Sequence, residues 1–586
     1  MISLQSLPEF AEFCAQLEAL SVKGWAVIAF YGFCIVAALW LCGFVFKTLL
    51  VWGLRRLGCA TPRLWYAFPA VPWRVFYRTY MTVRGWQESV FKLGKVSSGG
   101  FASVLSTLTN VYHRDMVPLG LAWIFGLSCY AYIGLNVKTH LQVIGSSGAG
   151  KSVWAKTLLS EWNNSAFVID AKNGELSRDL AASDNKRQWV QLRPYDPDSS
   201  GQCNPLDCLH EAIESAGENE AIRVANRIGA SFIETPPQSK QPFFTDTSRG
   251  YLVGLILFVY NQFPEDERNL GTVRDLIVHG LRVYNEDGSL ESTSEEAIAY
   301  LQHRMMESTA FGGAIAGAAG PYINAGQETL GNLQATLQER TKILDIPSVR
   351  HMLARTTRPL RELKTCDDYV LVLDAQVSSI RGELKDLVRL LTNMVVYTFE
   401  VTQESKGSCL FLLDEFNAQG YNAQIEAFLP VARGHKAVIV ILIQDLEGLK
   451  AAYPLTYRAF TGNSTATLWM STAHPMNLIE LSNTLGKKTL VIKDPHTGRK
   501  SYREVKVAEP DQLGRFLNEK SRNMIVTRAG ARPLRLKLDP HYLALPVWRY
   551  TPDPDHKETF LRRVMRKMLA RRLQHLQNTP TEGDQL

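Results

Sequence analysis

His140-Leu-Gln-Val-Ile144 is a short apolar stretch that runs directly into Gly145-Ser-Ser-Gly-Ala-Gly150-Lys151-Ser152, and a helix-forming segment from Val153 to Trp162 follows. The spacing G-x-x-x-x-G-K-S, after a strand and before a helix, is the signature of a phosphate-binding loop. An accidental glycine turn explains it poorly, because chance would also have to supply both flanking elements. This stretch therefore predicts an α/β fold with an open parallel sheet.

The loop itself is suited to a nucleoside triphosphate. Its glycines let the backbone wrap so that N–H groups point at the phosphates, and the helix N-terminus adds a favourable dipole. Lys151 would reach the β- and γ-phosphates, and Ser152 would ligate Mg²⁺. The residues expected to contact the cofactors, ATP and Mg²⁺, are Gly145, Ser146, Ser147, Gly148, Ala149, Gly150, Lys151 and Ser152.

A second apolar strand, Cys409 to Leu413, ends in two acidic residues, Asp414 and Glu415. A phosphate-binding loop needs a metal-binding carboxylate at the end of a neighbouring strand. We assign that role to Asp414, acting through water, and the role of orienting and deprotonating the attacking water to Glu415. An apolar run that ends in two acids is common by itself, so this assignment depends on the phosphate loop.

Two further candidates flank a third apolar strand, Val438 to Ile443. The strand ends in Gln444, and side chains at the carboxyl ends of parallel strands face the ligand crevice, so Gln444 is a candidate γ-phosphate sensor rather than an ordinary strand-end glutamine. Arg433 closes a short helix predicted from Ile425 to Ala432. Two explanations of it stay open: an arginine finger offered to a neighbouring subunit's ATP, or a basic residue that suits the helix dipole before a capping glycine.

The composition of the chain limits its number of domains, its binding partners and its compartment. The chain has 586 residues, of which 46% are hydrophobic, so it can form two or three domains. Its net charge of +7 is a mild indication that it binds polyanions or anionic lipid. The same charge is equally typical of an ordinary, slightly basic protein. Nine cysteines occur without a CxxC pair, which indicates a reducing compartment without a disulfide framework or a structural zinc site.

Trp25 to Phe46 is an uncharged apolar run, long enough to cross about 30 Å of hydrocarbon as a helix. It starts too late and lacks the basic leader of a signal peptide. Basic residues from Lys47 to Arg84 follow it, so the positive-inside rule places the C-terminal body in the cytoplasm. A second apolar run, Val117 to Val137, would leave almost no chain between the membrane and the phosphate loop; we predict a buried hairpin there.

These motifs resemble the type IV secretion system coupling proteins, the conjugative DNA-transfer ATPases related to septal DNA translocases. Val168 to Leu176 is similar to the family's strand ending in D-x-K-G-E, with one extra residue, Asn173, before the glycine. Ala473-His474-Pro475 departs from the family, which often has an acidic residue and a threonine there. The other matching segments are Gly99–Ser103, Val117–Gly120, Tyr195–Asp198, Asn204–Asp207, Leu412–Phe416, Ala432–Gly434, Ile443–Gln444, Gly462–Ser464 and Leu485–Thr489.

The resemblance implies a RecA-like P-loop nucleotide-binding domain, interrupted by an all-α insertion domain and preceded by a transmembrane helix. Amphipathic helices such as Glu211 to Ile233 and Ser248 to Asn261 fit the insertion, and the small-residue stretch Gly312 to Gly320 is expected to be a flexible loop rather than a packing surface. The predicted segments are a non-cytoplasmic segment 1–24, a transmembrane helix 25–46, a basic connector 47–98, the nucleotide-binding domain in two parts 99–207 and 346–550, the insertion 208–345, and a basic helical tail 551–586.

By resemblance, the chain is expected to form a homo-hexamer at the bacterial inner membrane and to move DNA, independently of its sequence, or a relaxase–DNA complex. Relaxosome proteins and type IV secretion channel components are the other expected partners. One alternative is a receptor for protein effectors without DNA motor activity. Another is a receptor that binds ATP only to assemble. The basic tail could bind DNA, anionic lipid or a partner protein.

Overall fold

The computed structural model describes residues 101, 116–124, 129–136, 140–199, 201–234, 242–282, 293–493, 500–545, 550, 560 and 562–568. The predicted transmembrane helix 25–46, its flanks 1–24 and 47–98, and most of the basic tail lie outside these residues. Among the helices that are described, none is both long enough and apolar enough to cross a membrane.

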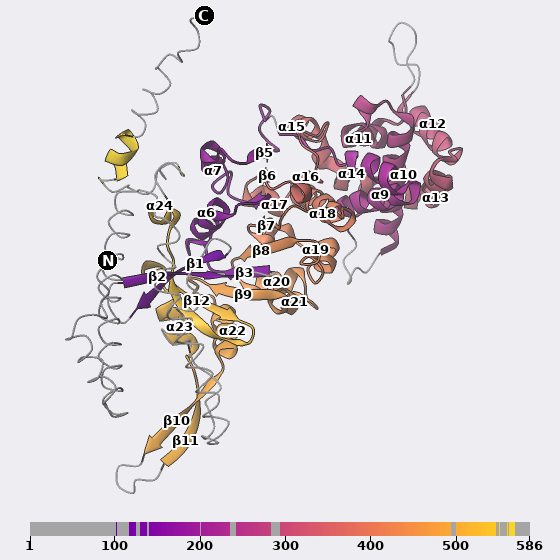
Figure 1. Ribbon diagram of the computed structural model, residues 1–586. Helices are drawn as coiled ribbons and strands as arrows, with labels where there is room; N and C mark the ends of the chain where they lie inside the picture. Colours follow the sequence, from indigo (N-terminus) through magenta and orange to yellow (C-terminus); the bar gives the residue numbers. More distant parts are fainter. Residues whose placement is uncertain are drawn as a thin grey trace, which may run out of the picture.

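An eleven-stranded sheet forms the centre of the molecule (Figure 1). Its strands lie in the order β2-β1-β13-β12-β9-β3-β8-β7-β4-β6-β5. The run from β9 to β5 is parallel, and the strands from β2 to β12 pair antiparallel. The bounds are β1 (Val117–Ile124), β2 (Cys129–Leu135), β3 (His140–Ile144), β4 (Ala166–Asp170), β5 (Gln188–Leu192), β6 (Tyr369–Asp374), β7 (Cys409–Leu413), β8 (Ala437–Ile443), β9 (Ser464–Trp469), β12 (Asn523–Arg528) and β13 (Ala531–Lys537).

The central parallel strands are buried on both faces, which explains why they are continuous apolar runs in the sequence. Every residue of β3, β4, β6, β7 and β8 is buried. Alternate residues point to opposite faces: Phe167 and Ile169 of β4 lie in one hydrophobic core, and Ala166 and Val168 lie in the other. The sheet therefore separates two cores, each closed by helices.

The apolar run Val117 to Val137 forms a hairpin, as predicted. β1 and β2 pair antiparallel, with Val117 opposite Leu135. Trp154, which lies buried on α6 (Lys151–Glu161), donates its indole N–H to the carbonyl of Pro118 at 3.0 Å. The hairpin is thus packed against the helix that follows the phosphate loop.

A group of helices lies between β5 and β6 in the chain and to one side of the sheet (Figure 1). It is joined to α18 (Lys385–Val401), where Arg389 and Asn393 donate to the carbonyl and hydroxyl of Ser231 at 3.0 and 2.8 Å. The helices are α8 (Asp207–Ala216), α9 (Glu218–Phe232), α10 (Pro242–Gln262), η2 (Glu265–Glu267), α11 (Leu270–His279), α12 (Ser294–Met306), η3 (Ala310–Gly313), α13 (Ala314–Ile323), α14 (Gln327–Thr341), η4 (Lys342–Asp345), α15 (Pro347–Met352) and α16 (Glu362–Thr365).

Three local predictions differ from the structure. The expected helix from Glu211 to Ile233 is two helices, because Gly217 adopts φ 84° and ends α8. The helix expected to reach Ala432 stops at Phe428. The flexible loop predicted from Gly312 to Gly320 is wrong, since its alanines favour a helix and α13 packs tightly on α10.

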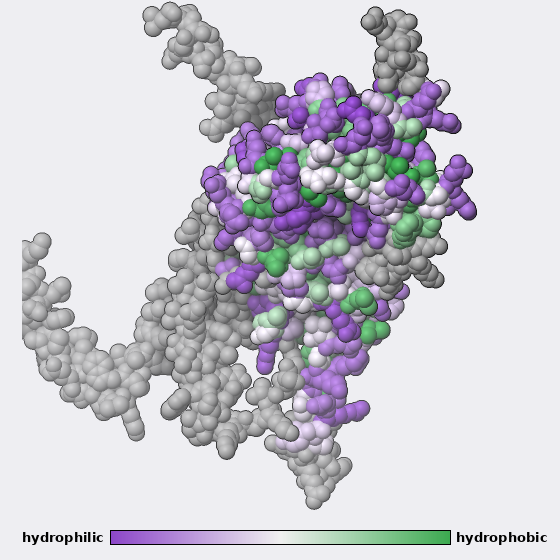
Figure 2. Space-filling model, turned by 90° about the vertical axis from the view of Figure 1, so that its right-hand side faces the viewer, coloured by the Kyte–Doolittle hydropathy of each residue, from purple (hydrophilic) through white to green (hydrophobic). Residues whose placement is uncertain are grey.

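The contact between α13 and α10 shows why small residues are needed there. Tyr251 of α10 stacks on Tyr322 of α13 with ring centroids 3.9 Å apart. A β-carbon on Gly254 would lie 3.2 Å from the β-carbon of Ala318, so the two backbones approach closely at this point. Figure 2 views the molecule from this side, where polar and apolar residues are interspersed over the face that the structure describes.

Most of the remaining elements connect strands of the sheet. β10 and β11 form a separate two-stranded ribbon that projects from the body at the end away from the helical group (Figure 1). These elements are α7 (Arg178–Ser183), α17 (Val377–Arg381), η5 (Phe416–Gln419), α19 (Ala423–Phe428), α20 (Leu446–Ala452), α21 (Tyr457–Gly462), α22 (Pro475–Leu485), β10 (Lys487–Lys493), β11 (Lys500–Lys506), α23 (Pro510–Phe516), η6 (Glu519–Ser521) and α24 (His541–Ala544).

Replacing Phe411 by alanine is expected to lower the free energy of unfolding by about 3–5 kcal/mol, because a cavity is left in a closed core. Phe411 is fully buried, and its ring packs edge-on against Phe167 and Phe399 at 5.7 and 5.0 Å. Urea titration followed by far-ultraviolet circular dichroism measures the change. Phe243→Ala is the control, because that side chain is 57% exposed; equal losses in the two variants would contradict the packing described for β7.

Candidate nucleotide site

The phosphate loop is held by the ends of three adjacent strands. Gly145, directly after β3, donates its N–H to the carbonyl of Ile443 at the end of β8, at 3.2 Å, and Ser146 donates to Ser471, beyond β9, at 2.8 Å. Gly150 has φ 91°, and a β-carbon there would lie 2.4 Å from Leu538 Cδ2. Only glycine meets both conditions, so the loop is shaped by its neighbours as well as by its own sequence.

Lys151 and Ser152 open α6 and are buried. The Lys151 ammonium donates to the carbonyl oxygens of Gly145 and Ser146 at 2.6 and 3.3 Å, so the side chain lies folded over its own loop. Burial lowers the pKa of Lys151, while the nearby charges of Glu415 and Asp414 oppose that shift. The ammonium group of Lys151 thus lies over the loop, where the phosphates of a nucleotide would bind.

Asp414 follows β7 and is completely buried. Its Oδ1 accepts the backbone N–H of Glu415 at 3.0 Å, whereas Oδ2 has no hydrogen-bond partner among the described residues. Burial raises the pKa of Asp414 to about 7, and the charges of Lys172 and Lys151 oppose this. A buried carboxylate oxygen without a partner among the described residues suits a divalent cation such as Mg²⁺.

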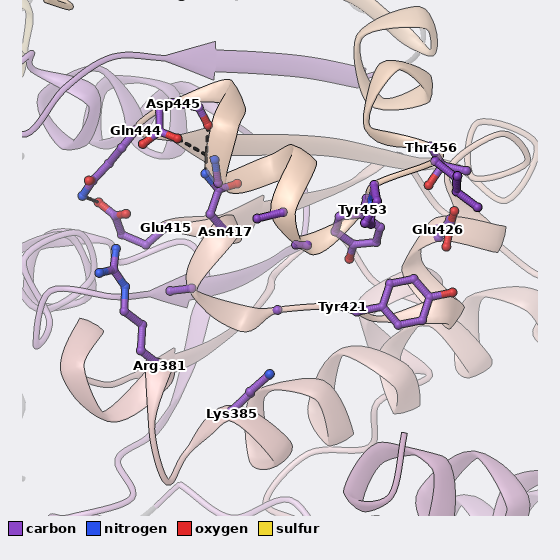
Figure 3. Close-up of a pocket in the computed structure, with 17 residues that line it drawn as sticks. Arg381, Lys385, Glu415, Asn417, Tyr421, Glu426, Gln444, Asp445, Tyr453 and Thr456 are labelled. Atoms are coloured by element: carbon purple, nitrogen blue, oxygen red, sulfur yellow. Dashed lines mark hydrogen bonds between the residues drawn. The ribbon is translucent and has the colours of Figure 1, made fainter. Parts of the chain in front are cut away.

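Glu415 and Gln444 contact each other beside the loop. β8 lies between β3 and β7 in the sheet, so Gln444 is carried to a position between the loop and the acidic pair. Gln444 Nε2 donates to Glu415 Oε1 at 3.0 Å (Figure 3). Glu415 has φ 47°, a left-handed conformation that costs a non-glycine residue about 1 kcal/mol. Backbone strain at a buried carboxylate is typical of functional sites.

Arg433 is not part of this cluster. It is exposed in the turn before β8, whereas Gln444 follows the same strand. The seven residues of β8 span about 20 Å between the amino and carboxyl ends of the strand. Arg433 therefore cannot reach the nucleotide site of its own chain. The carboxyl ends of the parallel strands therefore bring together Lys151, Ser152, Asp414, Glu415 and Gln444. Arg433 lies at the opposite, amino ends of the strands.

The structure adds Lys172 to the cluster. Its ammonium donates to the Ser152 hydroxyl at 2.7 Å. The signal for this residue was the D-x-K-G-E resemblance, but the sequence alone assigns it no role, because Asn173 interrupts the motif. Asn173 takes φ 55° and the turn continues, so the extra residue is absorbed without removing Lys172 from the site.

A cleft of about 620 Å³ adjoins the site on the side of Glu415 and Gln444. Arg381 points from the end of α17 toward Glu415, and Tyr421 and Tyr453 lie toward the far end (Figure 3). Asn417 shapes the wall by donating to the carbonyl of Asp445 at 2.9 Å. The sequence pattern gave no sign that Arg381 lies beside the site. Arg381 reaches the site because β6 pairs with β4, which brings the following helix α17 to the carboxyl ends of the strands.

A glycine-rich loop between strand and helix, a buried acidic pair two strands away, and a glutamine on the strand between them define a P-loop protein with a RecA-like sheet. The family model for type IV secretory system conjugative DNA transfer matches residues 105–538, and the chain belongs to this family. The resemblance seen in the sequence is thereby confirmed.

Known relatives agree with this assignment. Protein VirD4 of Rhizobium radiobacter is 24% identical over 476 residues, which are 77% of this chain and 63% of that protein. The chain thus spans less than two thirds of that relative's length. The bacterial conjugative coupling protein TrwBdeltaN70, unbound, has a TM-score of 0.53 at 14% identity, over 70% of this chain and 86% of that one. TrwB in complex with ADP and Mg²⁺ has a TM-score of 0.52 at 15% identity, over 70% and 87%. These structures share the fold.

Proposed function

We propose that the protein is a membrane-anchored ATPase that hydrolyses ATP to recruit DNA or a relaxase–DNA complex and to move it into a type IV secretion channel during conjugation. The observation that carries the proposal is the convergence of Lys151, Ser152, Asp414, Glu415 and Gln444 at one edge of the sheet, in a chain of the conjugative DNA-transfer family. A receptor that only binds DNA would need none of the buried acids.

Each residue of the site has its own role in ATP binding or hydrolysis. Lys151 and the N–H groups of the loop bind the phosphates, and Ser152 and Asp414 hold Mg²⁺, which supplies positive charge to the phosphates when bound. Glu415 accepts the proton of the attacking water. Gln444, which donates to Glu415 at 3.0 Å, orients that carboxylate and senses the γ-phosphate.

The partners and location follow the same proposal. The apolar run 25–46 anchors the chain in the bacterial inner membrane, with the body in the cytoplasm, on the strength of the charges that flank it. Subunits form a homo-hexamer and work with relaxosome proteins and channel components. The division into domains at 99–207, 208–345 and 346–550 belongs to this proposal; the helices run on past Asp345 to Thr365 before β6 begins.

Steady-state ATP hydrolysis by the full chain in detergent, with and without DNA, tests the function. We expect DNA of unrelated sequences to stimulate hydrolysis equally, and added salt to remove the stimulation, because contacts with phosphates release counterions. Hydrolysis that proceeds at full rate but ignores DNA would overturn the DNA motor and favour a coupling receptor for protein effectors. Absence of hydrolysis would overturn the ATPase itself.

Arg433→Ala is expected to lower hydrolysis by about a thousandfold, the lower range for loss of an arginine finger. The reason is that Arg433 lies at the edge of the sheet opposite its own site and can act only on a neighbour's nucleotide. Mixing the variant with wild type should reduce activity by more than its share of subunits. Arg355→Ala, which removes another exposed arginine, is the control. Activity that falls in simple proportion to the mixture would rule out action between subunits.

A further inference from the structure

Lys172 lies where the metal side of the nucleotide site would be. It follows β4, which pairs with β7, so its turn lies beside Asp414. Its ammonium donates to Ser152 Oγ at 2.7 Å, and its charge is the strongest of those that lower the pKa of Asp414. One lysine thus contacts the hydroxyl, and acts on the carboxylate, to which the divalent cation is assigned.

The turn that carries Lys172 is built to hold it there. Asp170 is fully buried, and its carboxylate accepts the N–H groups of Lys172, Leu176 and Ser177 at 3.2, 2.9 and 3.0 Å and the hydroxyl of Ser177 at 2.9 Å. The backbone of Lys172 also forms an antiparallel bridge with Gln376. The position of Lys172 is therefore set by its turn, and only its side chain is free to move.

A second acceptor is available to that side chain. Glu175 Oε2 lies 3.6 Å from the Lys172 ammonium, on the solvent side of the turn, with 42% of its side chain exposed. Lys172 itself is 31% exposed, so its ammonium can leave Ser152 for Glu175 without crossing the core. The two positions differ in whether the charge faces Ser152 and Asp414 or the solvent.

We propose that Lys172 is a positioning residue that supplies an intramolecular cation to the metal side of the site and withdraws toward Glu175 when Mg²⁺ binds. This inference rests on the proposed nucleotide and Mg²⁺ site. Asp414 Oδ2 has no hydrogen-bond partner among the described residues, so an ionised Asp414 with no cation beside it would be an uncompensated buried charge, which is costly. An ammonium 2.7 Å from Ser152 Oγ and a divalent cation on the same oxygen repel each other, so they exclude one another.

The turn that holds Lys172 is also joined to a neighbouring strand. Arg178, at the start of α7 in the same segment, forms an ion pair with Asp374 at the end of β6, at 3.1 Å. The bridge between Lys172 and Gln376 joins the same loop. That loop continues into α17, which places Arg381 beside the cleft, so the turn stays tied to the cleft wall while the side chain of Lys172 moves.

The test is the Mg²⁺ concentration that half-maximally tightens binding of a fluorescent ADP analogue, mant-ADP, to the full chain. In Lys172→Met we expect this concentration to fall by about tenfold, because a competing cation is gone and couplings of this size are usual between exclusive ligands. Lys172→Arg, which keeps the charge, should restore the wild-type requirement.

Lys156→Met is the matched control, because Lys156 is a buried lysine on α6 that pairs with Asp179 at 3.5 Å. It should leave the Mg²⁺ requirement unchanged; if Lys172→Met folds poorly by circular dichroism, Lys172→Gln repeats the measurement. An unchanged or raised Mg²⁺ requirement in Lys172→Met would overturn the inference and make Lys172 a structural residue. No binding by wild type would overturn the proposed function as well.

Discussion

Replacing Glu415 by glutamine is expected to leave nucleotide binding intact and to lower ATP hydrolysis by about 10²- to 10⁴-fold, the usual contribution of a general base. Glutamine has the shape of glutamate, so the strained backbone at φ 47° and the contact with Gln444 have no steric reason to change. It cannot take a proton from water. DNA transfer between cells should fail together with hydrolysis.

Two measurements separate binding from chemistry in this variant: mant-ATP affinity and steady-state release of phosphate. Glu426→Gln is the control, because Glu426 is a carboxylate that lines the same cleft at the end away from Gln444 (Figure 3). Hydrolysis near the wild-type rate in Glu415→Gln would remove Glu415 from the chemistry. If hydrolysis were lost while DNA transfer continued, the protein would act as a receptor and not as a motor.

Replacing Lys151 by alanine is expected to weaken ATP binding and to reduce hydrolysis by at least about a hundredfold, because one preorganised donor to a phosphate has an effect of this size. Lys151 is the cation within the loop, and it is directed across it by hydrogen bonds to Gly145 and Ser146. DNA-stimulated hydrolysis should disappear with the basal rate. The readouts are mant-ATP affinity and phosphate release on the full chain.

Lys156→Ala is the control for this prediction, since it removes a lysine from the same helix whose partner is Asp179 and not the loop. It should bind ATP as wild type does. Wild-type affinity in Lys151→Ala would show that the glycine-rich loop does not hold the phosphates, and the proposed function would lose its basis.

The strand order explains how these residues come to act together. In the chain, the loop lies at 145–152 and the acidic pair at 414–415, yet β3 and β7 are separated by β8 alone. All three strands are parallel, so their carboxyl ends meet at one edge. The roles of these residues, and of Arg433, stay predictions until the variants are measured.

The sequence by itself determined the elements whose signals are local. The loop from Gly145 to Ser152, the strand before Asp414 and the hairpin from Val117 are each specified within a few residues, because turn geometry, helix N-termini and runs of apolar side chains depend on near neighbours. These motifs also indicated that the chain belongs to the coupling protein family. The stretch from Gly312 was misjudged because its glycines favour a loop locally, whereas its alanines together with packing against α10 make it a helix from Ala314 onward.

Tertiary structure alone decided which side chains meet. The sequence pattern does not place Lys172 against Ser152 or Gln444 against Glu415. These relations follow from strand order and from the direction of each crossing, which are set by how two buried cores close around the sheet. Such packing depends on contacts between residues far apart in the chain, and those contacts leave no signal in any short stretch of sequence.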